Sequence, residues 1–141
     1  MEQVLEAARS LPLYKLAPRA VVVTEGGKTG KLYILKAGDL EVVRDGSSVA
    51  AIAEPGSIIG EMSALLDEPH SATVRTRGGA ELYVADDPDA FLDAHPAVAR
   101  HLAKLLAVRL QKTTALLVNM RRQSKVREDH EMFDKIFALL K

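Results

Sequence analysis

The residues best suited to chemistry lie between Gly60 and His70. Gly60 directly precedes Glu61, and both follow the apolar pair Ile58 and Ile59. Glycine lets backbone N–H groups approach an anion, and the start of a helix adds positive potential. A neighbouring carboxylate accepts hydrogen bonds from hydroxyl groups, and it needs such donors where it is buried. This order predicts a site for a small ligand that carries both an anionic group and hydroxyls.

Short apolar segments separated by turn residues surround this stretch. Asp45-Gly46 is typical of a two-residue hairpin loop, and Pro55-Gly56 of a turn. We therefore expect a mainly β fold with flanking helices, in which residues 19–87 form an antiparallel β-barrel or jelly roll of about eight strands. Glycine turns predicted at 37–39 and 77–79 contribute to that count. Composition alone leaves a cupin-like barrel as an alternative.

Helical patterns flank the predicted barrel, and the 141 residues suit a single domain. Residues 1–18 are expected to form a short helix followed by an apolar plug, and residues 88–141 to form C-terminal helices. Asp87 with Pro88 predicts a helix start, and His95-Pro96 predicts a break before a long helix that begins near Ala97. Three apolar side chains after Glu61 are expected in the core: Met62, Leu65 and Leu66.

The long helix has two apolar faces. One follows the alternating spacing of four and three residues that paired helices use: Leu106, Leu110, Thr113, Leu117 and Met120. The other is assigned to the barrel: Leu102, Leu105 and Leu116. Two buried faces predict a homodimer through the helix from Leu106 to Met120, and packing of both faces within one chain is the alternative.

Charge and cysteine content limit the partners. Nineteen basic and nineteen acidic residues cancel, which gives no general attraction to nucleic acid or anionic lipid. The basic run at 121–127 is expected to be a solvated helix face, so nucleic acid is not an expected partner. The sequence has no cysteine and shows neither an apolar span nor a leader. We therefore expect a cytoplasmic chain with no disulfide and no membrane partner.

Catalysis is not expected either. The four histidines include no close pair that would bind a metal: His70, His95, His101 and His130. The chain shows no nucleophile–histidine signature and no phosphate-loop lysine. We therefore predict no catalytic residue, no metal site and no cofactor, and hence a protein that is not an enzyme.

Residues 60–74 have the order Gly-Glu-x-x-x-Leu-Leu-x-x-Pro-x-Ser-Ala-Thr-Val. This order resembles the phosphate-binding cassette of cyclic nucleotide-binding domains, in particular those of the Crp/Fnr (catabolite activator) type. The turn at Glu25-Gly26, the strand at 32–35 and the helix motif at 109–114 also fit that family. The resemblance covers roughly residues 20–120.

The resemblance implies a regulatory module that senses cAMP, or cGMP as the alternative, and couples binding to movement of the C-terminal helix. Gly60 and the turn after it would present N–H groups to the cyclic phosphate, and Glu61 would bind the ribose 2′-hydroxyl. Thr113 and Thr114 would contact the purine, one of them from the partner subunit. The expected ligand-binding residues are Ile59, Gly60, Glu61, Met62, Ser63, His70, Ser71, Ala72, Thr113 and Thr114.

Simpler interpretations of these residues stay open. A cap for the short helical turn that follows it is the alternative role of Glu61. Thr113 and Thr114 are also consistent with an exposed helix surface or with polar positions that set the register of paired helices. About twenty residues follow Met120, too few for the helix-turn-helix domain of the resembling transcription factors. A stand-alone domain and a fragment of a Crp-like regulator are both consistent with this, and the downstream partner is not identified.

His70 stands where the resembling family has arginine. Arginine binds phosphate with a fork of N–H groups, whereas histidine offers one donor and is mostly neutral at pH 7. The loss of such a contact weakens binding by roughly 10- to 100-fold. Weak cyclic nucleotide binding, a different ligand, or an empty site in a dimerisation or interaction domain are the three alternatives. If His70 contacts the phosphate, affinity should be higher at about pH 6 than at about pH 8.

Overall fold

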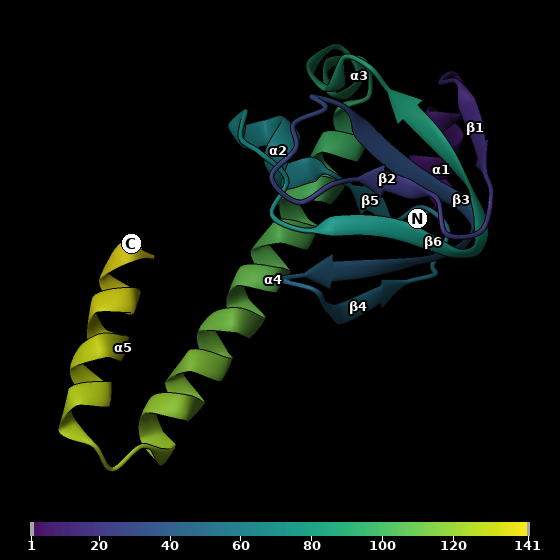
Figure 1. Cartoon of the computed structure of the whole chain (residues 1–141). Helices are drawn as coiled ribbons and strands as arrows, with labels where there is room; N and C mark the ends of the chain where they lie inside the picture. Colours follow the sequence, from purple (N-terminus) through teal and green to yellow (C-terminus); the bar gives the residue numbers. More distant parts are fainter. Residues whose placement is uncertain (1, 141) are drawn as a thin grey trace. The chain divides into compact units, whose positions relative to one another are not determined.

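The computed structural model describes residues 2–140, and the chain divides into two compact units, Met1–Val98 and Ala99–Lys141. The first unit contains the strands and three short helices, α1 (Glu2–Ala8), α2 (Glu61–Leu66) and α3 (Pro88–Ala94) (Figure 1). The second unit contains α5 (Arg127–Leu139) and most of α4 (Pro96–Gln123).

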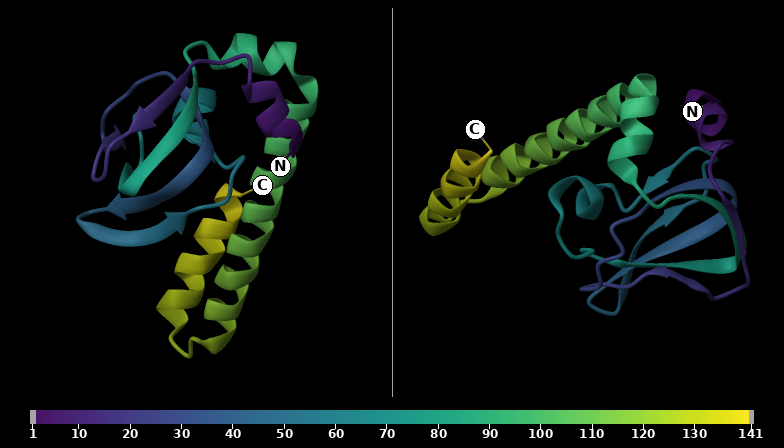
Figure 2. Two further views of the ribbon diagram at one scale, coloured as in Figure 1. Left: turned by 90° about the vertical axis from the view of Figure 1, so that its right-hand side faces the viewer. Right: turned by 90° about the horizontal axis from the view of Figure 1, so that it is seen from above.

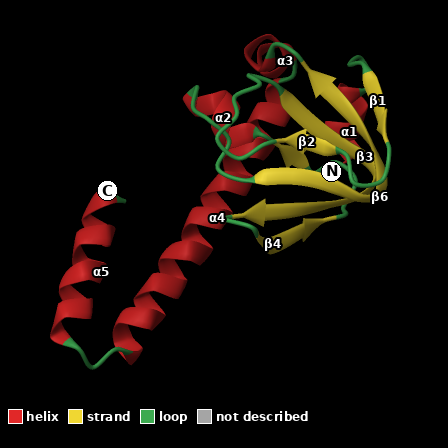
Figure 3. Cartoon of the chain, viewed as in Figure 1, coloured by secondary structure: helices red, strands yellow, loops and turns green. Residues whose placement is uncertain are grey.

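The strands of the first unit form one antiparallel sheet of six. In chain order they are β1 (Leu13–Leu16), β2 (Val21–Val23), β3 (Leu32–Arg44), β4 (Ser47–Ile52), β5 (Ile58–Ile59) and β6 (Thr73–Ala85). The main path is β1-β6-β3-β4, while β2 pairs with β6 and β5 pairs with β3. Figure 2 shows the strands curling around a shared interior, and Figure 3 shows the short helices α1, α2 and α3 outside the sheet. The prediction of a mainly β fold with flanking helices and a long C-terminal helix is confirmed.

The sheet has six strands rather than about eight because two predicted turns lie inside long strands. β3 runs through Gly38, where the register with β6 shifts and φ is 94°. A Cβ atom at position 38 would lie 2.7 Å from the Cα of Ala80. Glycine here permits a close approach of two backbones at a bulge, so it bends β3 without ending it. Gly79 does the same for β6, with φ at 106°.

The N-terminal segment contains a strand that the sequence did not predict. Leu13–Leu16 pair antiparallel with residues 80–83 of β6, where an apolar plug was expected. Leu13 and Tyr14 are 38% and 49% exposed, which fits an edge strand rather than a buried plug. The four residues lie between Pro12 and Pro18, too short a segment for a period of two to be recognised.

Apolar residues from four strands, β2, β3, β5 and β6, form the barrel core. They are Val23, Tyr33, Leu35, Leu40, Ile59, Val74, Ala80, Leu82 and Val84. The predicted helix boundary after the barrel is confirmed: the side chain of Asp87 accepts a hydrogen bond from the N–H of Ala90 at 3.1 Å, and Pro88 begins α3. His95 ends α3, and α4 begins at Pro96.

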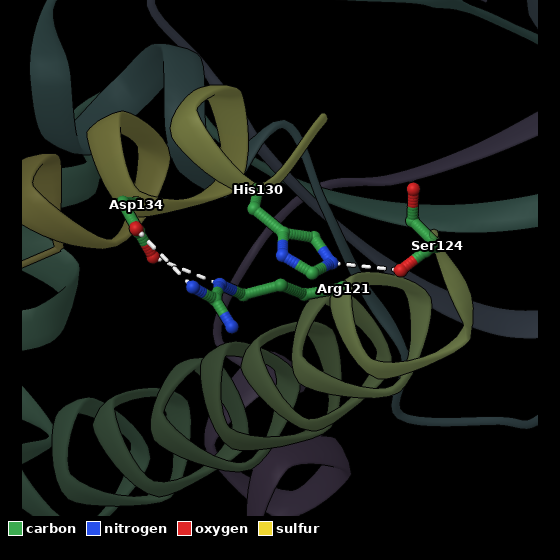
Figure 4. A network of polar contacts seen from close by, with 4 residues as sticks. All are labelled: Arg121, Ser124, His130 and Asp134. Carbon is green, nitrogen blue, oxygen red and sulfur yellow. Dashed lines mark hydrogen bonds and ion pairs between the residues drawn. The ribbon is translucent and has the colours of Figure 1, made fainter. Parts of the chain in front are cut away.

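In the second unit α5 lies beside α4, and polar contacts secure their connection (Figure 4). The guanidinium of Arg121 donates to both carboxylate oxygens of Asp134, at 2.9 and 3.3 Å. His130 Nε2 lies 2.7 Å from the carbonyl oxygen of Ser124. Because a carbonyl only accepts, Nε2 carries the hydrogen in this contact.

Both predicted apolar faces of α4 include exposed side chains. Leu102 is 2% exposed, but Leu116 on the same predicted face is 59% exposed. Leu116 belongs to the second unit, and its packing against the barrel stays a prediction. On the other face Leu110 and Met120 are 50% and 48% exposed.

Candidate ligand-binding site

The cassette begins where β5 ends. Ile58 and Ile59 pair with Ile34 and Tyr33 of β3 and are buried. Gly60 then adopts a left-handed conformation, with φ at 85°, and α2 starts at Glu61. A Cβ atom at position 60 would lie 3.1 Å from the carbonyl oxygen of Lys31 and 3.6 Å from His70 Cε1. Glycine at position 60 therefore permits the left-handed turn and also the close packing of the cassette against Lys31 and His70.

The loop after α2 is closed by its own hydrogen bonds. The buried hydroxyl of Ser63 donates to the carbonyl oxygen of Glu68, and the N–H of Glu68 donates to the carbonyl oxygen of Ser63 at 3.1 Å. Asp67 ends the helix with φ at 53°, and its carboxylate pairs with Lys28 at 2.8 Å. The Ser63 side chain is thus used within the loop, so a ligand contact at this position would have to come from its backbone.

His70 ties the cassette to the turn before β3. Its N–H donates to the carbonyl oxygen of Gly27 at 2.8 Å, and its carbonyl oxygen accepts from the N–H of Gly26 at 2.9 Å. Its Nε2 lies 3.0 Å from the hydroxyl oxygen of Thr29, and the residue is 6% exposed. Thr29 was not among the predicted site residues. It lies 41 positions from His70, and no local sequence pattern marks such a pairing.

Burial lowers the pKa of His70 from the ordinary value of 6.5. Desolvation disfavours the charged imidazolium, so the side chain is neutral at neutral pH. The permanent cation of the family's arginine therefore has no counterpart at this position. Any gain in affinity from protonation of His70 is now expected only below pH 6.5, so the difference between pH 6 and pH 8 should be smaller than the sequence suggested.

The depressed pKa of His70 also predicts how stability depends on pH. The free energy of unfolding should fall as the pH drops below 6.5, because the unfolded chain then binds a proton that the folded chain binds only at lower pH. The contribution is complete above 6.5 and is lost as the pH approaches the folded-state pKa. Urea midpoints at about pH 5.5 and about pH 7.5 measure this change.

His70→Gln should flatten that dependence. If this variant shows the same difference between the two pH values as the wild type, His70 is not the group responsible.

The apolar residues of α2 point outward. Met62, Leu65 and Leu66 are 55%, 47% and 57% exposed, so the prediction that they belong to the core is wrong. The helix has six residues, and Ser63 is its buried position. The side chain of Ser63 points inward because its hydroxyl donates a hydrogen bond to the loop after α2. The cassette itself therefore carries three exposed apolar side chains.

The remaining predicted residues occupy two units. Glu61 is half-buried at the start of α2, and Ser71 and Ala72 lead from His70 into β6. Thr113 and Thr114 lie on α4 in the second unit, and the hydroxyl of Thr113 donates to the carbonyl oxygen of Arg109 at 2.8 Å. A role for the two threonines at the cassette stays a prediction.

Residues 2–140 contain neither a group of side chains suited to a metal ion nor a helix suited to a membrane. Histidine, aspartate and glutamate side chains do not gather there into a group of three that would bind a metal ion. None of the helices in this part of the chain combines the length and apolar character that crossing a membrane requires.

Residues 14–95, more than half of the chain, match the family model of the cyclic nucleotide-binding domain. The chain belongs to this family. A search of curated proteins gives no significant match.

Solved structures show the same relationship. The catabolite activator protein of Thermus thermophilus is 27% identical with a TM-score of 0.72, over 84% of this chain and 59% of that chain. The N-terminal domain of a transcriptional regulator from Streptomyces coelicolor is 30% identical with a TM-score of 0.58, over 79% of this chain and 84% of that chain. PKAR CBD2 bound to Sp-2Cl-cAMPS is 17% identical with a TM-score of 0.64, over 79% of this chain and 75% of that chain.

These comparisons confirm the Crp/Fnr-type resemblance of the cyclic nucleotide-binding domain. The chain spans less than two thirds of the length of the Thermus protein. What it shares with these structures is the fold of a ligand-sensing regulatory module.

Proposed function

We propose that this cyclic nucleotide-binding domain senses cAMP, with cGMP as the alternative, and transmits binding through α4. The observation that carries the proposal is the local geometry at Gly60. A left-handed glycine ends β5, and a carboxylate follows at the first position of α2. This arrangement leaves the first N–H groups of α2 without carbonyl partners in the helix, next to an acceptor for hydroxyl groups. PKAR CBD2, which has the same fold, binds Sp-2Cl-cAMPS.

In this proposal Glu61 binds the ribose 2′-hydroxyl, and the N–H groups after Gly60 meet the cyclic phosphate. Ser71 and Ala72 add contacts beside the phosphate. His70 is neutral and already bonded to Thr29, so it adds little to phosphate binding at pH 7. We therefore expect weaker binding than in a cassette that carries arginine at this position.

α4 supplies the proposed output. Its exposed residues Leu110 and Met120 share a face with the half-buried Leu106 and Leu117. Apolar side chains at that spacing suit a second copy of the same helix, and this supports a homodimer. Thr113 and Thr114 would then contact the base, one of them from the partner subunit. Binding shifts such a helix pair only if the ligand contacts it differently in its two arrangements.

A second candidate rests on the neutral state of His70. A nucleoside has the hydroxyls that suit Glu61 and carries no phosphate charge that needs a cation. The affinity for such a ligand would not depend on an arginine at position 70. The third candidate is a domain that binds no nucleotide and serves dimerisation or protein interaction.

A thermal-shift screen with cAMP, cGMP, AMP and adenosine separates these candidates. Ligand at 100 times its dissociation constant stabilises the native state by about 2.7 kcal/mol. For a chain of this size that corresponds to a rise in Tm of roughly 5–10 °C. We expect cAMP to give this rise and linear AMP to give much less. An equal rise with adenosine favours the nucleoside, and no rise with any of the four favours the interaction domain.

A further inference from the structure

A cavity lies on the outer face of the sheet, away from Gly60, Glu61 and His70. Its volume is about 570 Å³, and its lining consists of Arg19, Val21, Glu41, Arg75, Thr76 and Arg77. Along β6, Arg75 and Arg77 are exposed while the alternate residues Val74 and Thr76 are buried. The two arginines therefore share the solvent face of the strand.

Three hydrogen bonds hold Arg19 at the edge of this cavity. The hydroxyl of Thr76 donates to the carbonyl oxygen of Ala17 at 2.6 Å and accepts from the N–H of Ala20 at 2.9 Å. The N–H of Thr76 donates to the carbonyl oxygen of Ala20 at 2.8 Å. Thr76 is 1% exposed, so these bonds are shielded from water. The loop that carries Arg19 is thereby fixed against β6.

Arg19 has an uncommon backbone conformation, with φ at 60°. Side chains with a Cβ are disfavoured there, and glycine or asparagine would adopt the same turn at lower energy. An unfavourable backbone at a fixed position points to a role for the side chain that occupies it. At position 19 this side chain carries a guanidinium, which joins those of Arg75 and Arg77 at the cavity.

The cavity has an excess of positive charge. Arg75 Nε donates to the carboxylate of Glu41 at 3.1 Å, which fixes its guanidinium. Hydrogen bonds from Ser48 and then Arg75 lower the pKa of Glu41, so this carboxylate stays charged. One carboxylate therefore faces three guanidinium groups in a chain whose formal net charge is zero.

We propose that this cavity binds a small phosphate anion of high charge, such as a pyrophosphate group, at a site separate from the cassette. Planar guanidinium groups form paired hydrogen bonds to phosphate oxygens. A volume of 570 Å³ lies within the range of small-molecule sites, about 300–1,000 Å³. The charges surround a concavity instead of following a stripe. These features favour a compact anion over nucleic acid.

Calorimetric titration of the full chain with sodium pyrophosphate, at fixed ionic strength, tests this site. Arg77→Gln and Arg19→Asn should each weaken binding by about tenfold or more, because each removes a hydrogen bond to a charged group. Arg19→Asn keeps a residue that tolerates the left-handed turn, so its Tm without pyrophosphate should not fall. Arg9→Gln removes the same charge from an exposed position outside the cavity and should leave affinity unchanged.

Several outcomes would overturn the proposal. Equal weakening by Arg9→Gln would mean that only net charge matters, and no measurable heat with the wild type would mean that the site does not bind pyrophosphate. If a short DNA duplex binds more tightly than pyrophosphate through the same arginines, the surface belongs to nucleic acid. Glu61→Gln should leave pyrophosphate binding intact, so failure of the cassette proposal and failure of this one can be told apart.

Discussion

Replacement of Glu61 by glutamine should weaken cAMP binding by roughly 10- to 100-fold while the folded structure persists. Glutamine keeps the shape of the side chain but loses the charge that strengthens a hydrogen bond from the ribose 2′-hydroxyl. Glu61 is half-buried at the first position of α2, where a sugar hydroxyl would meet it next to the N–H groups proposed to face the phosphate. Isothermal titration calorimetry with cAMP measures the change.

Glu68→Gln is the matched control. Glu68 lies in the same loop and is exposed, and the structure uses its backbone to close the loop with Ser63. Its side-chain charge should therefore have little effect on affinity. The alternative role of Glu61 as a helix cap gives a different result: the Tm without ligand would fall while the affinity for cAMP stayed the same. That result would remove Glu61 from the binding site.

Local features of the cassette could be predicted because adjacent residues determine them. Gly60 follows a buried apolar pair and precedes a carboxylate, and in the structure it begins the expected turn, in a left-handed conformation. The Asp45-Gly46 hairpin is confirmed for the same reason, with φ at 51° and 78°. In both cases two or three neighbouring residues restrict the backbone enough to decide its path.

Contacts between distant residues could not be predicted in this way. The bond between His70 and Thr29 spans 41 positions, and the bond between Thr76 and Ala20 spans 56. The sequence therefore indicated the missing arginine at position 70 but not the partner that keeps its replacement buried. The cavity that combines Arg19 with β6 was missed for the same reason. Arg75 and Arg77 alternate along one strand, but Arg19 reaches them only through the fold.

The error about α2 has a different physical cause. Apolar residues normally indicate a core, but a helix of six residues can bury only one narrow face. Ser63 occupies the buried position, and its hydroxyl donates a hydrogen bond to the loop. Met62, Leu65 and Leu66 are exposed. Exposed apolar groups of this kind next to a ligand site often mark a surface that another molecule or segment contacts. Hydrophobicity alone does not distinguish such a surface from a core.

His70→Arg should tighten cAMP binding by roughly 10- to 100-fold, the reverse of the loss inferred from the missing guanidinium. The proximity of His70 Cε1 to Gly60 supports this expectation, since a Cβ at Gly60 would lie 3.6 Å from it. A guanidinium that extends past this contact would lie beside the N–H groups proposed to bind the phosphate. Calorimetry measures the gain, and affinity for adenosine, which has no phosphate, should not change.

Two comparisons separate charge from geometry at this position. His70→Lys adds a permanent charge without the fork, so it should give a smaller gain than His70→Arg. The affinity of the arginine variant should also be independent of pH, whereas that of the wild type should rise only below pH 6.5, where the neutral imidazole begins to take up a proton. Both variants lose the bond to Thr29, so their Tm values must first show that they fold. If the folded arginine variant binds cAMP no better than the wild type, the phosphate of the ligand does not lie next to position 70, and the nucleoside or ligand-free alternatives gain support.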